Sequence, residues 1–200
     1  MNREDLLRRT FEEWTNGLDP VRARVELFER VRDLPYVYPS SRDPVEVLAA
    51  GQGSASGKHH LLAELFRLLG LEVRHVMCTH RFNESAIAFP KQLQVLLEKN
   101  EITDIHEYLQ VAVDGQWVDV DATWPRELRE FGFPVNDEWD GRSPMLLSVA
   151  ADEVVVVRGN PEKAKDELLA TWTPRQRQLR HQFLLELSAW VKELYSEATH

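Results

Sequence analysis

A single β-hairpin in the middle of the chain constrains the fold more than any other feature. Apolar and polar residues alternate from Ile105 to Val113 and again from Trp117 to Thr123, and Asp114-Gly115 between them is a strong two-residue turn signal. Strands joined by so short a turn pair in antiparallel fashion. The sequence therefore predicts a mostly antiparallel sheet at the centre of the molecule.

Patterns of apolar residues at helical spacing surround this hairpin. Asn16-Gly17 ends the first pattern, while Asp19-Pro20 and Asp43-Pro44 are typical starts for the next two. We expect helices over residues 6–14, 20–34, 44–49, 58–69, 90–100, 161–171 and 174–197, and further strands over residues 71–82 and 154–157. Helices, then a sheet, then helices form an α+β layout.

The length and composition indicate one globular domain. The 200 residues suit a single domain with a substantial core, and 43% hydrophobic with 28% charged residues excludes a disordered chain. With 24 Lys and Arg against 33 Asp and Glu the formal net charge is −9, so we expect neither nucleic acid nor an anionic membrane as a partner. The chain starts with charged residues rather than an apolar export signal, so we expect a cytoplasmic protein.

The polar face of the hairpin carries a histidine and a carboxylate. Side chains alternate between the two faces of a strand, so His106 and Tyr108 share one face. If Asp114-Gly115 forms the turn, Asp121 lies opposite Tyr108 and one two-residue step from His106. A neighbouring carboxylate holds a histidine in one tautomer and stabilises its protonated form. The pair is either a general base with its orienting carboxylate or two polar residues on a solvent face.

A loop of small residues precedes the strongest helical pattern. Residues 51–57 read Gly-Gln-Gly-Ser-Ala-Ser-Gly and run directly into that pattern. A nucleophile at a helix start gains from the helix dipole, and the free backbone N–H groups there can form an oxyanion hole.

Together the loop and the hairpin resemble the transglutaminase-like superfamily of papain-like Cys-His-Asp enzymes, over roughly residues 43–124. The first block is the loop and its helix, which ends in Leu65-Phe66-Arg67-Leu68-Leu69-Gly70-Leu71 and leads into Glu72-Val73-Arg74-His75-Val76. The second and more specific block is His106-Glu107-Tyr108-Leu109, the turn, and Trp117-Val118-Asp119-Val120-Asp121-Ala122-Thr123-Trp124.

The resemblance implies a papain-like core in which a central helix packs on an antiparallel sheet. We expect this core over residues 43–135 of a single domain, residues 1–200. N-terminal helices over residues 1–42 and a C-terminal strand and helices over residues 136–200 flank it.

The resemblance also assigns roles to site residues. His106 is the general base and Asp121 orients it, but the family's nucleophilic cysteine falls on Ala55, whose methyl group cannot attack a carbonyl. Three explanations stay open: an engineered replacement of cysteine by alanine, a natural protein that keeps the cleft for binding, or a nucleophile at Ser54 or Ser56.

With cysteine at position 55, the resemblance implies acyl transfer from an amide, by hydrolysis or by transamidation. As written, we expect the chain to be inactive in that chemistry, and the alternative is a non-catalytic binding module that uses the same cleft. The expected ligand is a small peptide or amide. Six residues are candidates to contact it: Gln52, Ser54, Ser56, His59, Tyr108 and Trp124.

The chain has one cysteine, Cys78, which excludes an internal disulfide and a multi-cysteine zinc site. In the middle of a strand, Cys78 is expected to be a small buried hydrophobe. The histidines show no His-Glu-x-x-His pattern, and His75 and His80 fall on opposite faces of their strand. We therefore expect no metal site and no cofactor.

The last predicted helix is long and carries an apolar stripe. It is expected to pack on the core, with covering of the cleft or pairing with a second copy in a homo-oligomer as alternatives.

Overall fold

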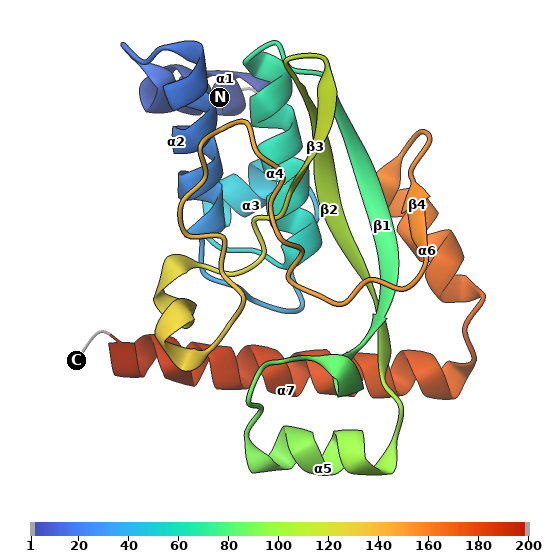
Figure 1. Cartoon of the computed structure of the whole chain (residues 1–200). Helices are drawn as coiled ribbons and strands as arrows, with labels where there is room; N and C mark the ends of the chain where they lie inside the picture. The colour runs from blue at the N-terminus through green and yellow to red at the C-terminus, as the bar shows by residue number, and fades with distance from the viewer. Residues whose placement is uncertain (1–2, 199–200) are drawn as a thin grey trace.

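The predicted hairpin forms in the computed structural model, which describes residues 3–198 (Figure 1). Strands β2 (Thr103–Val113) and β3 (Gln116–Val120) meet at Asp114 and Gly115, whose φ angles of 51° and 81° are those of a tight hairpin turn. β1 (Val73–Arg81) pairs with the other edge of β2, and β4 (Val154–Val156) pairs with β1. The sheet therefore has the order β3-β2-β1-β4, and all its pairs are antiparallel.

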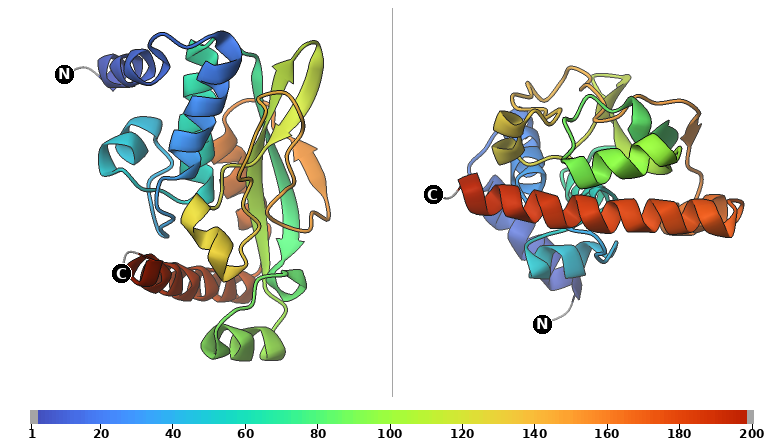
Figure 2. Two further views of the ribbon diagram at one scale, coloured as in Figure 1. Left: turned by 60° about the vertical axis from the view of Figure 1, so that its left-hand side comes forward. Right: turned by 90° about the horizontal axis from the view of Figure 1, so that it is seen from below.

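A layer of helices covers one face of this sheet (Figures 1 and 2). The central helix α4 (Ala55–Leu68) lies against β2, and α1 (Arg3–Thr15), α2 (Pro20–Arg32) and α3 (Pro44–Ala50) pack behind it. Leu61, Leu62 and Leu65 of α4 share one buried cluster with Leu109 and Val111 of β2. The predicted α+β class, with a central helix packed on an antiparallel sheet, is confirmed.

A second core lies below the sheet, and all its buried residues except Tyr36 come from Phe82 onward. Helix α7 (Pro174–Ala198) runs across the end of the sheet, with α5 (Lys91–Lys99) beside it (Figure 2). The short helices η1 (Phe82–Glu84) and η2 (Arg126–Phe131) contribute to the same region, and α6 (Pro161–Ala170) connects β4 to α7. The apolar stripe of α7 is buried in this core through Phe183, Leu184, Leu187, Val191 and Leu194. Packing of the last helix on the core, one of the expected alternatives, is thus confirmed.

The helix starts follow from capping residues in the sequence. The Asp19 and Asp43 carboxylates each accept two backbone N–H bonds, and a proline follows each of them. Helix α4 begins at Ala55 and not at Lys58, because Ser54 caps it and accepts a hydrogen bond from the Gly57 N–H. The expected start at residue 58 was therefore wrong by nearly one turn.

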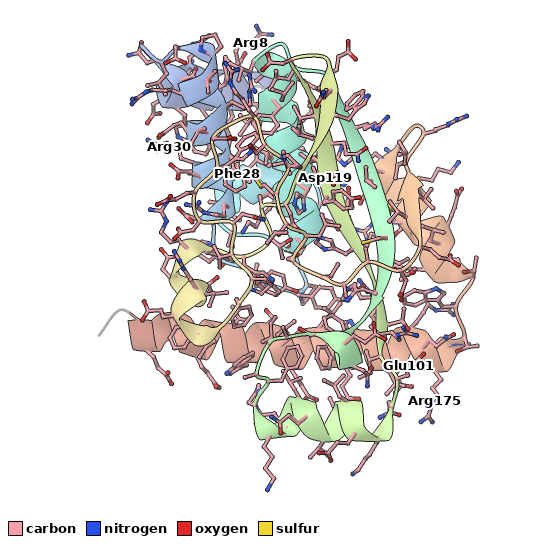
Figure 3. The ribbon with its side chains drawn as sticks, in the orientation of Figure 1. Arg8, Phe28, Arg30, Glu101, Asp119 and Arg175 are labelled. Carbon is pink, nitrogen blue, oxygen red and sulfur yellow. The ribbon has the colours of Figure 1, made fainter. Side chains whose placement is uncertain are left out.

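Charged side chains cover the outside of the molecule. In Figure 3, Arg8, Arg30, Glu101 and Arg175 lie at the periphery, while Phe28 lies within the helical layer, where it packs against Trp139 at 5.4 Å between ring centroids. Within residues 3–198, none of the helices combines the length and the apolar character needed to cross a bilayer.

Candidate active site

His106 and Asp121 form a buried pair at the end of the hairpin. The His106 Nε2 atom lies 2.9 Å from Asp121 Oδ2, and both side chains are almost completely shielded from solvent. Burial alone would raise the pKa of Asp121, but the charge and the hydrogen bond of His106 hold that pKa well below its usual range. Asp121 is therefore an ionised carboxylate suited to fix one orientation of the imidazole.

Neighbouring residues fix the Asp121 carboxylate in turn. Its Oδ1 atom accepts hydrogen bonds from the Thr123 N–H and hydroxyl, at 3.0 and 2.6 Å. Its Oδ2 atom also accepts from the Ser148 N–H and hydroxyl, at 2.8 and 2.9 Å. Ser148 lies on the long segment between η2 and β4, and no local pattern in the sequence predicts its contact with Asp121.

The start of α4 faces the same site. Ala55, the first residue of α4, lines a cavity of about 230 Å³ together with His106. Other elements complete the wall of this cavity, which we call the active-site cavity: Tyr36, Tyr38, Pro39, Ser40, Arg42, Ser54, Ser56, Asp104, Ile105, Glu107, Lys165, Arg180 and Leu184. The predicted trio of Ala55, His106 and Asp121 thus lies in one region, with Asp121 behind the histidine.

A second polar pair lies in this cavity. Lys165 of α6 is buried, and its Nζ donates a hydrogen bond to Ser56 Oγ at 2.8 Å. Burial lowers the pKa of Lys165, while the charges of Asp104 and Glu107 act in the opposite direction. No sequence pattern points to Lys165, because a lysine on a helix far along the chain is ordinarily a surface residue.

Residues 10–122 match the family model described as the transglutaminase-like superfamily. The chain belongs to the transglutaminase-like superfamily. The match includes Ala55, His106 and Asp121, and it starts within the N-terminal helices, well before the resemblance seen in the sequence from residue 43.

No curated protein matched the chain. Among solved structures, one similar chain is described as "a Putative Cysteine Protease from Cytophaga hutchinsonii". The two chains share 16% sequence identity at a TM-score of 0.44, and the similarity covers 60% of this chain and 37% of the other. This chain therefore corresponds to little more than a third of that structure.

Of the six residues predicted to contact ligand in this transglutaminase-like protein, only two line the active-site cavity. Ser54 and Ser56 line the active-site cavity, whereas Gln52 is exposed outside its lining. Tyr108 is buried with its ring stacked beside His106, at 6.2 Å between centroids, and Trp124 lines a different cavity together with Ser148.

His59 does not line the active-site cavity. Its side chain is completely buried, and Nε2 accepts a hydrogen bond from the Ala122 N–H at 2.9 Å. The neighbouring Lys58 is completely buried too, and its Nζ donates to the carbonyls of Arg32 and Thr123 at 2.7 and 2.9 Å. Lys58 and His59 thus connect α4 to backbone groups of other segments.

Cys78 is the small buried residue that the sequence predicted. It faces a cluster of Val76 and Tyr108, and it pairs with His106 across β1 and β2. Burial raises the pKa of the Cys78 thiol to about 12, so this cysteine is a poor source of thiolate at neutral pH.

Three potential metal ligands, one of them Glu107, lie close together between α4 and the sheet. His60 of α4, His75 of β1 and Glu107 of β2 are buried, and one ligand atom from each lies within 4.8 Å of the others. The expectation of no metal site rested on the spacing of the histidines along the chain. Only the packing of α4 on the sheet brings these three residues together.

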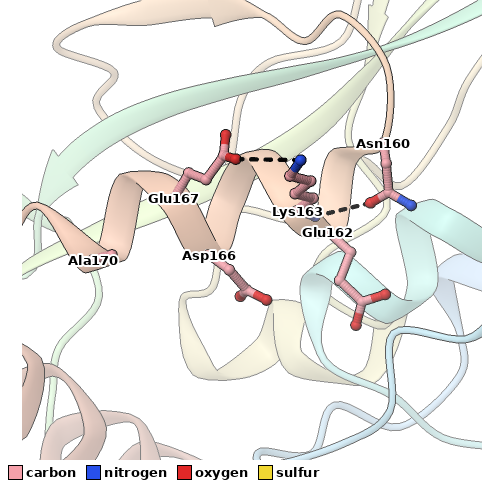
Figure 4. Close-up of a pocket in the computed structure, with 6 residues that line it drawn as sticks. All are labelled: Asn160, Glu162, Lys163, Asp166, Glu167 and Ala170. Carbon is pink, nitrogen blue, oxygen red and sulfur yellow. Dashed lines mark hydrogen bonds and ion pairs between the residues drawn. The ribbon is translucent and has the colours of Figure 1, made fainter.

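The outer face of α6 carries another hollow, lined by Asn160, Glu162, Lys163, Asp166, Glu167 and Ala170 (Figure 4). Lys163 forms an ion pair with Glu167 at 3.7 Å, and the Asn160 side chain caps the helix by accepting from the Lys163 N–H. Side chains of one exposed helix line this hollow, and we assign it no chemistry.

Proposed function

We propose that the active-site cavity binds the acyl part of a small peptide or amide, and that it supports acyl transfer when a cysteine stands at position 55. The observation that carries this proposal is the shared cavity of His106, held by Asp121, and the first residue of α4. With Ala55 in place, the chain binds such a ligand without forming a thioester, as a binding module of this fold would.

The geometry supports a defined sequence of steps for the cysteine form. His106 takes the thiol proton, and the sulfur attacks the amide carbonyl carbon to give a tetrahedral oxyanion. Backbone N–H groups in the first turn of α4 stabilise the oxyanion, as free helix N-terminal donors can. The C–N bond then breaks, His106 returns the proton to the leaving amine, and water or a second amine accepts the acyl group from sulfur.

The size of the cavity favours a small ligand. A volume of about 230 Å³ lies below the range of roughly 300–1,000 Å³ that is typical of sites for drug-sized molecules. Such a cavity fits a side chain or a short acyl group.

The proposal is tested with p-nitrophenyl acetate and the Ala55→Cys protein. The introduced thiolate should attack the ester carbonyl, release one equivalent of p-nitrophenolate in a burst, and leave an acetyl group on sulfur that mass spectrometry detects. The matched control is Ala55→Cys with His106→Gln, in which the burst should slow by at least about 100-fold because the general base is gone. The proposal is overturned if the folded Ala55→Cys protein shows no burst, or if His106→Gln leaves the rate of the burst unchanged.

A specific observation favours a second candidate, a serine nucleophile. Ser56 and Lys165 are in hydrogen-bond contact inside the active-site cavity, and a lysine with a lowered pKa can serve as the base for a serine hydroxyl. In this reaction Lys165 takes the Ser56 proton, the oxygen attacks the acyl carbon of the amide, and the C–N bond breaks as Lys165 returns the proton to the leaving amine. Water then hydrolyses the acyl ester on Ser56. The chain would then be active with Ala55 in place.

A fluorophosphonate probe separates the two candidates. If Ser56 is a nucleophile, its oxygen attacks phosphorus, fluoride leaves, and the parent protein is labelled at Ser56. Labelling should disappear in Ser56→Ala and fall strongly in Lys165→Met, while the exposed-site control Ser143→Ala is labelled normally. An unlabelled parent protein excludes the serine mechanism and leaves the first proposal intact.

A further inference from the structure

The cluster of His60, His75 and Glu107 lies at the junction of three elements. One carboxylate oxygen, Glu107 Oε1, lies 2.7 Å from His60 Nε2 and 2.8 Å from His75 Nδ1. The three side chains are buried, and Glu107 is completely so. They converge from α4, β1 and β2, so the packing of the helix on the sheet fixes their relative positions.

The hydrogen-bond donors and acceptors of His60 do not balance in a neutral cluster. Its Nδ1 lies 3.0 Å from the Arg42 carbonyl oxygen, which can only accept, so Nδ1 carries the hydrogen. In a neutral imidazole the other nitrogen, Nε2, then presents a lone pair. That lone pair points at a carboxylate oxygen only 2.7 Å away, so the two acceptors either share a proton or separate slightly to hold a metal ion at about 2.0–2.2 Å from each.

Glu107 supplies a second and independent sign of a missing partner. Its other oxygen, Oε2, is buried and has no hydrogen-bond partner within the described residues 3–198. Leaving a charged oxygen buried without a partner is costly, so such atoms call for an explanation.

We propose that His60, His75 and Glu107 bind a divalent transition-metal ion of the zinc class. Two imidazole nitrogens and one carboxylate oxygen are a common set of protein ligands for zinc, with a further position left for water. The ion would take the lone pair of His60 Nε2 and the free carboxylate oxygen. The Arg42 carbonyl, which accepts from His60 Nδ1, matches the outer hydrogen bond that orients metal-binding histidines.

The proposed site has a route to solvent. A cavity of about 310 Å³ opens beside His60 and His75 and is bordered by Arg42 and by the start of α6. Asn160 and Glu162, which Figure 4 shows at this end of α6, line the same cavity. Glu107 itself lines the active-site cavity. The metal proposal stands without the proposed acyl chemistry, since none of its ligands takes part in that reaction.

Zinc titration of the chelator-treated protein tests the site directly. Isothermal calorimetry should show one Zn²⁺ per chain, and Co²⁺ in place of zinc should give the visible absorption of a low-coordinate site. Bound zinc should also raise the melting temperature, because a ligand that binds only the native state stabilises it. A parent protein that takes up no stoichiometric Zn²⁺ overturns the proposal and leaves a protonated His-Glu-His cluster as the explanation.

Two variants and a matched control assign the ligands. His75→Ala and Glu107→Gln should each weaken zinc binding by at least about 100-fold, more than the loss typical of outer-shell partners. His80→Ala changes another buried histidine of β1 on the opposite face, and it should bind zinc like the parent protein. Zinc binding that survives both ligand variants assigns the ion elsewhere and contradicts the proposal.

Discussion

At the scale of single residues, Asp121 makes many of the hydrogen bonds that hold the candidate active site in place. It accepts hydrogen bonds from His106, from both donors of Thr123 and from both donors of Ser148. The sequence could predict the His106–Asp121 pair, because strand periodicity and the two-residue turn together fix the register. Ser148 and Lys165 could not be predicted in the same way, since each reaches the site through tertiary packing and neither belongs to a local pattern.

Removing the charge of Asp121 should impair the proposed chemistry more than the fold. In the Ala55→Cys protein, Asp121→Asn should slow acylation by about 10²–10⁴-fold, because an amide favours the wrong imidazole tautomer. Stopped-flow release of p-nitrophenolate measures the rate, and circular dichroism checks the fold. Thr123→Val is the matched control: it removes one hydrogen bond to Asp121 but leaves His106 paired, so acylation should slow by less than tenfold. Equal rates in the Ala55→Cys protein with and without Asp121→Asn would contradict the orienting role.

At the scale of elements, α4 is the helix on which the site depends. Its first two turns bury Lys58, His59 and His60, and these side chains contact Arg32, Arg42, Glu107 and the adjacent residues Ala122 and Thr123. An apolar stripe alone predicts the later turns of α4 well and the first turn poorly. The Ser54 cap and buried polar contacts fix its start, and the spacing of apolar residues predicts neither of them.

Gly57, in the first turn of α4, should resist replacement by alanine. A Cβ at this position would lie 2.6 Å from the Ser41 carbonyl oxygen and 2.9 Å from Val47 Cγ2. Gly57→Ala should therefore destabilise the protein by about 1–3 kcal/mol through overpacking, although alanine is the better helix former by about 1 kcal/mol. Urea unfolding measures the change. An increase in the free energy of unfolding would show that the loop before α3 does not pack tightly on α4.

At the scale of the whole molecule, distant segments meet around the cleft. Lys58 binds the carbonyl at the end of α2 and the carbonyl of Thr123, next to Asp121. At the cleft wall, the Tyr38 N–H donates to Ser188 Oγ of α7 at 2.8 Å. The antiparallel sheet and the helix order followed from local patterns. The active-site cavity did not, because its wall combines residues from both halves of the chain.

Lys58 should make global stability depend on pH. Burial lowers its pKa to about 7 in the folded protein, although Asp33 and Asp121 raise it part of the way back. A neutral amine also has two N–H donors, which match the two carbonyls it contacts. Between about pH 7 and the ordinary lysine pKa of about 10.4, the unfolded chain binds a proton that the folded protein does not. Stability from this residue therefore rises with pH across that window.

The comparison that isolates this effect is Lys58→Met, which keeps the length of the side chain. Urea unfolding of both proteins at several pH values should give curves that diverge. The free energy of unfolding of the parent minus that of the variant should increase by up to about 1.4 kcal/mol per pH unit within the window. Parallel curves would mean that Lys58 keeps its ordinary pKa in the folded protein.

The proposed function depends most directly on whether the start of α4 activates a thiol at position 55. The deciding measurement is the pH dependence of iodoacetamide alkylation of the Ala55→Cys protein, with and without His106→Gln; Cys78 adds little because it is buried. The thiol should titrate well below the ordinary cysteine pKa of about 8.5 and should return toward that value when His106 is replaced. A thiol pKa at or above 8.5 that does not respond to His106→Gln would contradict the proposed active site.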